Sequence, residues 1–444
     1  MSAEGHCVET VAADLARRLI SATASPLPLL HVSPATSPSA DWARSGAMAL
    51  TGDVGGPPLA PSAPAPTVVE AATALLGTLG MSPLSDGAAL LGERGALLGL
   101  SRGGQVSCGG ATRLLRGTDG WVAVALARPE DWAAVPAWLD GAGSTWDEVA
   151  RALESMSVVT AAETARLLGL PCSVVPDRPP PSAAPWSLRR VTACRSEPIE
   201  AAPLVVDLSA LWAGPLCTSL LARCGAVVVK VEDPRRPDGG RRGMHAFYDL
   251  LNAGKRSVAG DLRQPFLLRL LQAADVVVTS SRRRAIEQLG VDPDDVLSSS
   301  PTVWVAVTGH GWEGSGQDRV GFGDDAAASA GLVAIGPDDG EPRFAGDAIA
   351  DPLCGSLAAL AALACLRAGG SWMVDAPLAG AARYAAALGS GRTTRPARNT
   401  RGLWTISGEA VAVPRARPHV GTARALGADT AEVTRWLAGS RHAH

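Results

Sequence analysis

The carboxylate of Asp351 is the clearest candidate nucleophile in the sequence. Asp351-Pro352 precedes the apolar run from Leu353 to Leu366, which is the pattern of a helix start with Asp at the N-cap and Pro at the first helical position. The positive end of a helix dipole keeps a carboxylate ionised, and an ionised carboxylate can attack an acyl carbon. The pattern by itself favours a structural cap and is compatible with a nucleophile.

Ser101 is a second candidate nucleophile. Gly99-Leu100-Ser101-Arg102-Gly103 matches the G-x-S-x-G pattern, in which the serine sits on a turn between a strand and a helix. The residues that follow, Gly104 to Gly110, are too rich in glycine to form that helix. A serine hydrolase is therefore a weak alternative.

The basic residues have an unusual composition. Lysine occurs only at Lys230 and Lys255 among 40 basic residues, as expected for a GC-rich genome in which Arg replaces Lys. Two lysines that escape this drift are candidates for a specific role. A run of arginines could bind phosphates or could be a solvated loop, and both interpretations stay open. The run contains Arg235, Arg236, Arg241 and Arg242.

Length and composition restrict the class of protein. A chain of 444 residues with 47% hydrophobic and 19% charged residues predicts two or three folded domains. A net charge of −3 offers no basic surface for nucleic acid. The longest apolar run is shorter than the roughly 20 residues of a membrane span, and no leader is recognisable. The eight cysteines form no C-x-x-C pair, so we expect no metal site. From the missing membrane span and leader we expect no membrane association and a cytoplasmic protein.

Short valine-rich strands alternate with helices after residue 200, which predicts an α/β fold with a Rossmann-like parallel sheet covered by helices. The expected strands are 204–206, 226–231, 276–278 and 302–307, and the expected helices are 216–223, 266–274 and 283–289.

Residues 108–175 predict a small α+β domain. A strand is expected at 120–126, and helices at 146–156 and 161–168, the first with a capping box at Thr145 and Glu148. The predicted division is a segment 1–107 with a Pro-rich part, the small domain 108–175, a linker 176–200, a catalytic α/β domain 201–390 and a tail 391–444.

Several motifs in residues 203–385, taken in order, resemble the class III CoA-transferases of the formyl-CoA and carnitine type. Each motif is weak alone, but their common order and spacing indicate the family. They are Asp207-Leu208-Ser209 with Ala213-Gly214-Pro215, Gly225 to Glu232 ("GA-x-V-x-KVE"), Asn252 to Ser257 with Asp261-Leu262, Arg282 to Gly290, Thr308 to Gly311, and Gly346 to Asp351.

The N-terminal half resembles other parts of the same family. Gly117 to Val122 and Leu168 to Val175 look like the first strand and the last segment of its small domain, so the family's parts are rearranged along this chain. With a gapless shift of 284, residues 41–79 also resemble 325–363, which predicts a partial duplicate of the catalytic core within 1–107. In that alignment Asp351 falls on Thr67, and the neighbouring prolines are expected to break the strand before it. The first copy is therefore predicted to be inactive and to supply the small domain to the second.

The resemblance implies a CoA-transferase with Asp351 as the catalytic nucleophile, passing through aspartyl-acyl and aspartyl-CoA intermediates. It implies acyl-CoA and a carboxylic acid as substrates, no permanently bound cofactor and a homodimer. Gly109-Gly110 is the candidate donor pair for the oxyanion. The residues implied to bind CoA are Lys230, Asn252, Lys255, Arg256, Arg282 and Gly309.

Some positions depart from the family pattern. Ser280-Ser281 replaces its Asn-Phe, and Asp233 and Thr308 stand where relatives often carry a basic residue. A non-catalytic acyl-CoA-binding or scaffold protein is therefore an alternative. An α-methylacyl-CoA racemase is another, but Phe322 occupies its histidine position, and His310 is expected to be structural because it lies twelve residues earlier.

Overall fold

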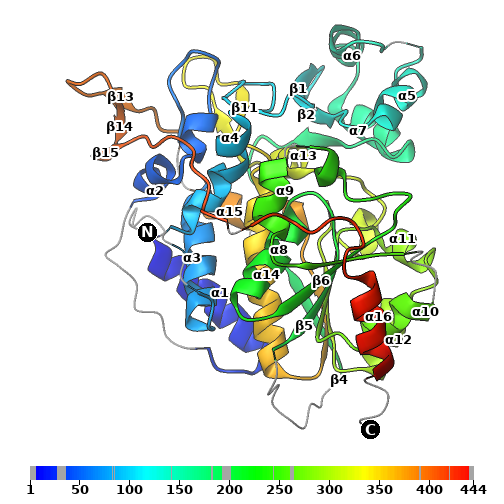
Figure 1. Cartoon of the computed structure of the whole chain (residues 1–444). Coiled ribbons are helices and arrows are strands. Elements are labelled where there is room, and N and C mark those ends of the chain that lie inside the picture. The colour runs from blue at the N-terminus through cyan, green and yellow to red at the C-terminus, as the bar shows by residue number, and fades with distance from the viewer. Residues whose placement is uncertain are drawn as a thin grey trace.

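A seven-stranded sheet forms the centre of the protein (Figure 1). The computed structural model describes residues 7–27, 37–82, 84, 86–141, 143–181, 184–192, 202–243, 245–260, 265–389, 392–419 and 421–439. The strand order is β4-β12-β9-β8-β5-β6-β7, and all neighbours are parallel except β4 and β12. The strands are β4 (Ser187–Thr192), β5 (Leu204–Leu208), β6 (Val227–Glu232), β7 (Arg256–Ala259), β8 (Val276–Thr279), β9 (Val303–Ala306) and β12 (Ser371–Asp375). The predicted parallel α/β sheet is confirmed.

The valine runs are buried on both faces of the sheet, as expected for parallel strands. Val276 and Val278 pack into one core with α8 (Ala213–Arg223) and α14 (Ala350–Ala368). Val277, between them, packs into the opposite core. That second core is covered by α10 (Pro265–Gln272), α11 (Arg283–Glu287), α12 (Pro293–Ser299) and α16 (Thr430–Gly439).

The predicted linker and tail take part in the fold. Residues 187–192, assigned to the linker 176–200, form the edge strand β4, because their backbone pairs with β12. In the tail, β13 (Ala397–Arg398), β14 (Trp404–Ile406) and β15 (Glu409–Ala410) form a small sheet, and the chain then crosses the molecule to α16 (Figure 1). Residues 193–200 of the linker and the Asp261-Leu262 motif lie outside the described residues.

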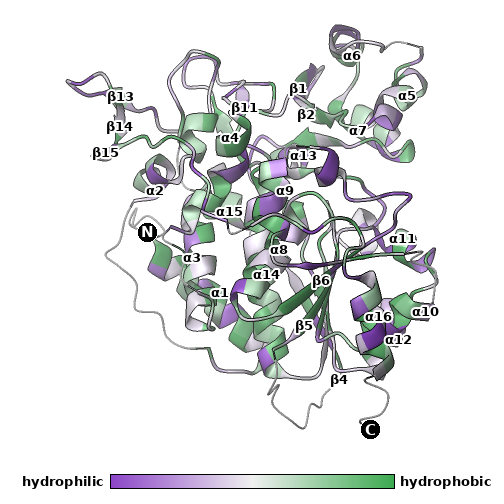
Figure 2. Cartoon of the chain, in the orientation of Figure 1, coloured by the Kyte–Doolittle hydropathy of each residue, from purple (hydrophilic) through white to green (hydrophobic). Residues whose placement is uncertain are grey.

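In the described part of the chain, four α-helices precede the small domain, and the first and third of them pack on the long helix α14. They are α1 (Val8–Thr23), α2 (Pro38–Ser45), α3 (Ala65–Thr78) and α4 (Glu93–Leu98). Residues of α1 and α3 belong to the same hydrophobic core as α14, α8 and α15 (Leu378–Ala387), so segments 1–107 and 201–390 share one core. Helix α14 is long and apolar enough to cross a membrane by length and composition, but 89% of its apolar window is buried inside the protein. It is a core helix, coloured mainly hydrophobic in Figure 2.

The small domain has the predicted α+β composition and a core of its own. Its antiparallel sheet consists of β1 (Thr112–Gly117), β2 (Gly120–Ala125) and β3 (Cys172–Val175), and its helices are α5 (Pro129–Trp138), α6 (Trp146–Leu153) and α7 (Val158–Leu167). It contacts the catalytic half where β2 and β3 meet α13 (Gly323–Ser329). A hairpin of β10 (Val333–Ile335) and β11 (Pro342–Phe344) connects α13 to the segment before α14.

The structure can be compared directly with the proposed duplicate. At the shift of 284, α2 aligns with α13 and α3 aligns with the first part of α14, so like elements fall on like elements. The expectation that prolines break a strand before Thr67 is wrong: Pro64 is the N-cap of α3 and Pro66 lies in its first turn, where proline is well tolerated. Thr67 is fully buried and donates a hydrogen bond of 2.6 Å to Asp41.

Candidate active site

The candidate site lies beyond the carboxyl end of β5, at the point where the strand order reverses. From β5 the chain continues to β6 and β7 on one side and returns to β8 on the other. Loops at such a point form the usual ligand crevice of open α/β sheets. Here the loop after β5 meets the loop after β8, because the Ala210 amide donates to Ser280 Oγ at 2.9 Å. Leu211 in the first loop has a left-handed backbone conformation, with φ of +69°, and is half exposed.

Asp351 caps a different helix from the one predicted. It is the second residue of α14, whose N-cap is Ile349, and its carboxylate therefore does not cap its own helix. Instead, Oδ1 of Asp351 accepts a hydrogen bond of 3.3 Å from the amide of Ala213, the first residue of α8. The N-cap assignment was wrong because Pro352 is at the third helical position. The expected pairing of a carboxylate with the positive end of a helix is present, but the helix is α8.

Asp351 belongs to a cluster of acids. Asp347 is fully buried and Asp324 is 8% exposed, whereas Asp351 keeps partial exposure and is the acid best placed to meet a ligand. Burial raises the pKa of Asp351 to about 7. Burial, together with the nearby charge of Asp347, raises the pKa of Asp324 to about 7 as well. Close carboxylates of this kind cannot all ionise without a compensating positive charge.

Arg94 of α4 supplies that positive charge from the N-terminal half. Its Nε and Nη2 atoms bind the two oxygens of Asp347 at 2.7 and 2.5 Å. The guanidinium also stacks on the indole of Trp212, 5.4 Å from the ring centroid. It opposes the rise in the pKa of Asp351. No motif in the sequence points to Arg94, which is separated from Asp347 by 253 positions.

The backbone comes very close to the Asp351 carboxylate. A Cβ atom at Gly323 would lie 2.1 Å from Asp351 Oδ2, so only glycine fits at this position. Ala348, in the turn before α14, has φ of +43° and donates its amide to Asp324 Oδ1 at 2.8 Å. A non-glycine residue in this conformation is strained, and such strain is concentrated at functional sites.

The loop that contains Gly109 lies next to Arg94. A Cβ atom at Gly109 would be 3.1 Å from Arg94 Nη2, and Gly109 and Gly110 are both exposed. Gly109 therefore comes close to the acid cluster. The N–H of Gly110 already donates to the carbonyl of Ser107 at 2.8 Å, so the predicted donor pair is reduced to Gly109. Both Arg94 and this loop belong to the N-terminal half.

The two lysines are buried and paired with protein groups. Lys230 is 1% exposed, forms a 2.9 Å ion pair with Asp238 and donates to the carbonyl of Ser209 at 2.8 Å. Lys255 is 3% exposed. Its Nζ lies 2.7 to 3.0 Å from four oxygens, which belong to Asp207, Thr218, Asn252 and Pro215. Both ammonium groups are buried and bonded to protein oxygens, which favours a structural role, and the predicted contact with CoA stays a prediction.

The other implied CoA-binding residues are scattered. Asn252 is buried and accepts from Lys255, and Arg256 forms a 3.1 Å ion pair with Glu432 of α16. Arg282 is partly exposed and donates to the carbonyl of Asp318. Gly309 packs against Gly321, whose Cα would lie 2.8 Å from an added Cβ. The structure thus brings Arg282 and Gly309 to the strand-end loops and places Asn252 in the interior.

In the predicted arginine run, two members have acidic partners. Arg241 forms an ion pair of 2.6 Å with Glu232, and Arg235 pairs with Asp233 at 2.7 Å. Arg236 is exposed and lies near Arg282, whose pKa is lowered by burial and by neighbouring positive charges. Those charges belong to Arg284, Arg128 and Arg236. Arg128 comes from the small domain, so this group of arginines spans both halves of the protein.

The structure also bears on the alternative nucleophile and on the histidine. Ser101 is exposed and follows helix α4 and a loop, whereas a nucleophile elbow requires a preceding strand. His310 lies twelve residues before Phe322 in the sequence, but in the structure its side chain approaches Gly321, the neighbour of Phe322. Its Nε2 would be 2.8 Å from a Cβ at Gly321 and lies 3.9 Å from Asp325 Oδ2. The side chain is 5% exposed, which fits the predicted structural role.

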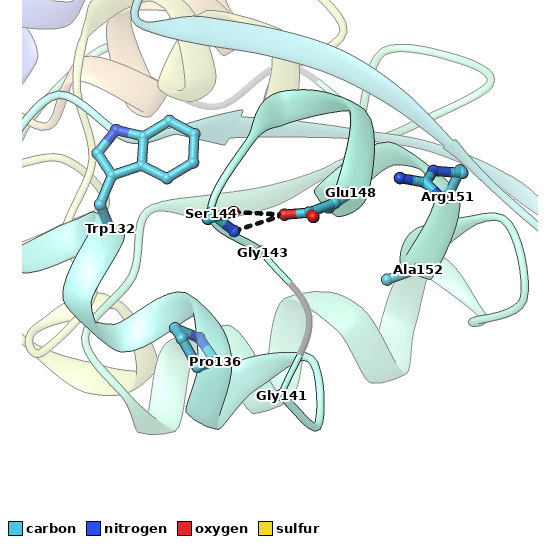
Figure 3. A pocket seen from close by; sticks show the side chains of 8 residues that line it. All are labelled: Trp132, Pro136, Gly141, Gly143, Ser144, Glu148, Arg151 and Ala152. Atoms are coloured by element: carbon cyan, nitrogen blue, oxygen red, sulfur yellow. Dashed lines mark hydrogen bonds between the residues drawn. The ribbon is translucent and has the colours of Figure 1, made fainter.

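A separate surface hollow of about 580 Å³ lies within the small domain, between α5 and α6 (Figure 3). Trp132 and Arg151 border it. Glu148 accepts hydrogen bonds from the amide and the hydroxyl of Ser144, in the turn before α6. The hollow is lined by the small domain alone, and the acid cluster contributes nothing to it. Among the described residues, no group of His, Cys, Asp or Glu has the geometry of a metal site.

Comparison with known proteins agrees with this geometry. Residues 203–420 match the sequence model of CoA-transferase family III, so this segment of the chain is similar to that family. It is 34% identical over 188 residues to a succinyl-CoA–D-citramalate CoA-transferase from Chloroflexus aurantiacus, covering 38% of this chain and 47% of the relative. It is 32% identical over 170 residues to a succinate–glutarate CoA-transferase from Agrobacterium fabrum, covering 34% of this chain and 42% of that relative.

Among solved structures, a CAIB/BAIF family protein from Brucella suis matches with 27% identity and a TM-score of 0.39, covering 41% of this chain and 54% of that one. The chain spans less than half the length of the two curated relatives named above.

Proposed function

We propose that the protein transfers CoA between an acyl-CoA and a carboxylic acid, with Asp351 as the nucleophile. The observation that carries the proposal is the position of Asp351. The residue keeps partial exposure, and its carboxylate is held against the N-terminus of α8, at the ligand crevice of a class III CoA-transferase fold. The curated relatives are named as CoA-transferases that act on succinyl-CoA or succinate and a second acid. Succinyl-CoA or a similar short diacid thioester is therefore the first donor to try.

The chemistry proceeds by covalent relay through Asp351. The carboxylate attacks the thioester carbonyl, the C–S bond breaks, and CoA leaves as a thiolate from a mixed aspartyl anhydride. The thiolate attacks the aspartyl carbonyl, which releases the donor acid and gives an aspartyl-CoA thioester. The acceptor carboxylate attacks this thioester and releases the thiolate, which then takes the acyl group from the new anhydride. Asp351 is regenerated and no net proton is consumed.

The residues around Asp351 fit this relay. Gly109 is exposed and lies beside Arg94, and its backbone N–H is the candidate donor to a developing oxyanion. The arginine group around Arg282, with Arg236 and Arg128, offers positive charge for the phosphates of CoA. A cytoplasmic location and a homodimer stay predictions.

The test is to incubate the protein with a panel of CoA thioesters and measure the mass of the intact chain. We expect an adduct on Asp351 that is lost in Asp351→Asn. Asn preserves the hydrogen bond to Ala213 but cannot attack, so folding is retained. Glu70→Gln is the matched control, because Glu70 is a carboxylate in α3 whose pKa burial also raises. An adduct on Ser101 would support a hydrolase, and the absence of any adduct would support a binding protein.

A further inference from the structure

The acid cluster cannot be understood from the catalytic half alone. Within residues 323–351 it contains the carboxylates of Asp324, Asp347 and Asp351, and the charge of Asp325 also acts on Asp351. The guanidinium of Arg94, which forms an ion pair with this cluster, comes from the N-terminal half. It is held in place by both oxygens of the fully buried Asp347, a bidentate geometry that lysine cannot reproduce.

Arg94 contacts both groups that border Asp351. On one side it binds Asp347, which lies four residues before Asp351 in the turn that leads into α14. On the other side it stacks on Trp212, whose neighbour Ala213 donates the hydrogen bond to Asp351 Oδ1. Displacement of Arg94 therefore changes both the local charge and the support of the loop that orients the carboxylate.

We infer that Arg94 is a positioning residue, supplied in cis by the N-terminal half, that favours the ionised form of Asp351 and orients it for attack. The inference rests on the proposed function and gives the N-terminal half a role in the chemistry in addition to donation of the small domain. With Arg94 present, the Arg94–Asp347 pair is close to neutral and Asp351 can carry a charge. Without Arg94, the buried charge of Asp347 opposes ionisation of Asp351.

Two substitutions should shift the pH dependence in opposite directions. Loss of a neighbouring opposite charge typically raises a carboxyl pKa by roughly one to three units. Arg94→Ala should therefore move the acidic limb of the pH profile of kcat/KM to higher pH by roughly one to three units. At pH 7 the value of kcat/KM should fall at least roughly fivefold, and it should recover at higher pH. Asp347→Asn removes the ion-pair partner of Arg94 and one negative charge near Asp351, and should move the acidic limb to lower pH. Arg94→Lys keeps the positive charge, so its acidic limb should lie close to that of the wild type.

Arg102 provides the matched control. It belongs to the same segment but donates to backbone carbonyls of Ala49, Asp53 and Gly56, not to an acid. Arg102→Ala should lower stability and leave the acidic limb in place. A loss of activity in Arg94→Ala that is equal at every pH would overturn the inference, because a purely structural residue would produce that result.

A titration without turnover separates this inference from the proposed function. Carboxyl-labelled aspartate allows the pKa of Asp351 to be followed by ¹³C NMR in the full-length protein, with Asp351→Asn to assign the signal. If that pKa rises in Arg94→Ala and falls in Asp347→Asn, the inference stands even where no CoA exchange is detected. If exchange is detected and neither variant moves the pKa, the inference fails and the proposed function survives.

Discussion

Replacement of Lys255 by methionine tests whether its network holds the fold together. The side chains are similar in length, but methionine cannot bind Asp207, which is fully buried. Lys255 lies 2.9 Å from that carboxylate and 2.7 Å from Thr218 Oγ1. Removal of one partner from a buried ion pair usually costs ~3–5 kcal/mol, because the remaining charge is stranded. Typical folded domains are stable by only ~5–15 kcal/mol, so the expected loss is a large part of the total.

The assay is urea unfolding followed by tryptophan fluorescence and circular dichroism. Arg256→Met is the matched control at the next position, where the ion pair with Glu432 is partly exposed and should be worth no more than ~1 kcal/mol. Asp207→Asn combined with Lys255→Met should recover part of the loss, because no unpaired charge then remains. If Lys255→Met cost less than ~1 kcal/mol, Lys255 would not be structural, and its predicted contact with CoA would regain support.

Three further predictions follow from the site. Ala348→Gly should raise the free energy of unfolding by ~1 kcal/mol, as measured in urea, because glycine adopts a φ of +43° without strain. The rate of CoA exchange should rise with pH and level off above about pH 7, because burial raises the pKa of Asp351 to about 7. Since this carboxyl binds its proton more tightly in the folded protein, stability should fall from about pH 4 to about pH 7 in the wild type and less in Asp351→Asn. Fragments 1–182 and 188–444 should be active only when co-expressed, and full exchange by 188–444 alone would contradict a catalytic role for the N-terminal half.

The sheet was predictable because its signal is local. Runs such as Val276 to Val278 have the composition of strands buried on both faces, and the structure places them in the centre of the sheet. The edge strand β4 was missed, since Ser187 to Thr192 is polar and forms a strand only by pairing with β12. Elements defined by long-range pairing carry little local signal.

The candidate site was only partly predictable for the same reason. The position of Asp351 near the start of a helix follows from the adjacent proline and apolar run. Its cap partner Ala213 and the ion pair between Arg94 and Asp347 depend on contacts between segments far apart in the sequence. The two lysines were correctly singled out as exceptional, but composition could not distinguish a ligand contact from a buried ion pair.

The shared core of helices α3 and α14 has a consequence for synthesis of the protein on the ribosome. Ten of the fourteen residues of α3 are buried, largely in the core that it shares with α14, which starts roughly 270 residues after α3 ends. At ~5–20 residues per second, the ribosome needs roughly 15–50 s to produce that partner. During this interval the apolar surface of α3 has no native cover. The nascent chain therefore presents a chaperone-binding surface from its first hundred residues, and slow translation of the second half would increase aggregation of the first.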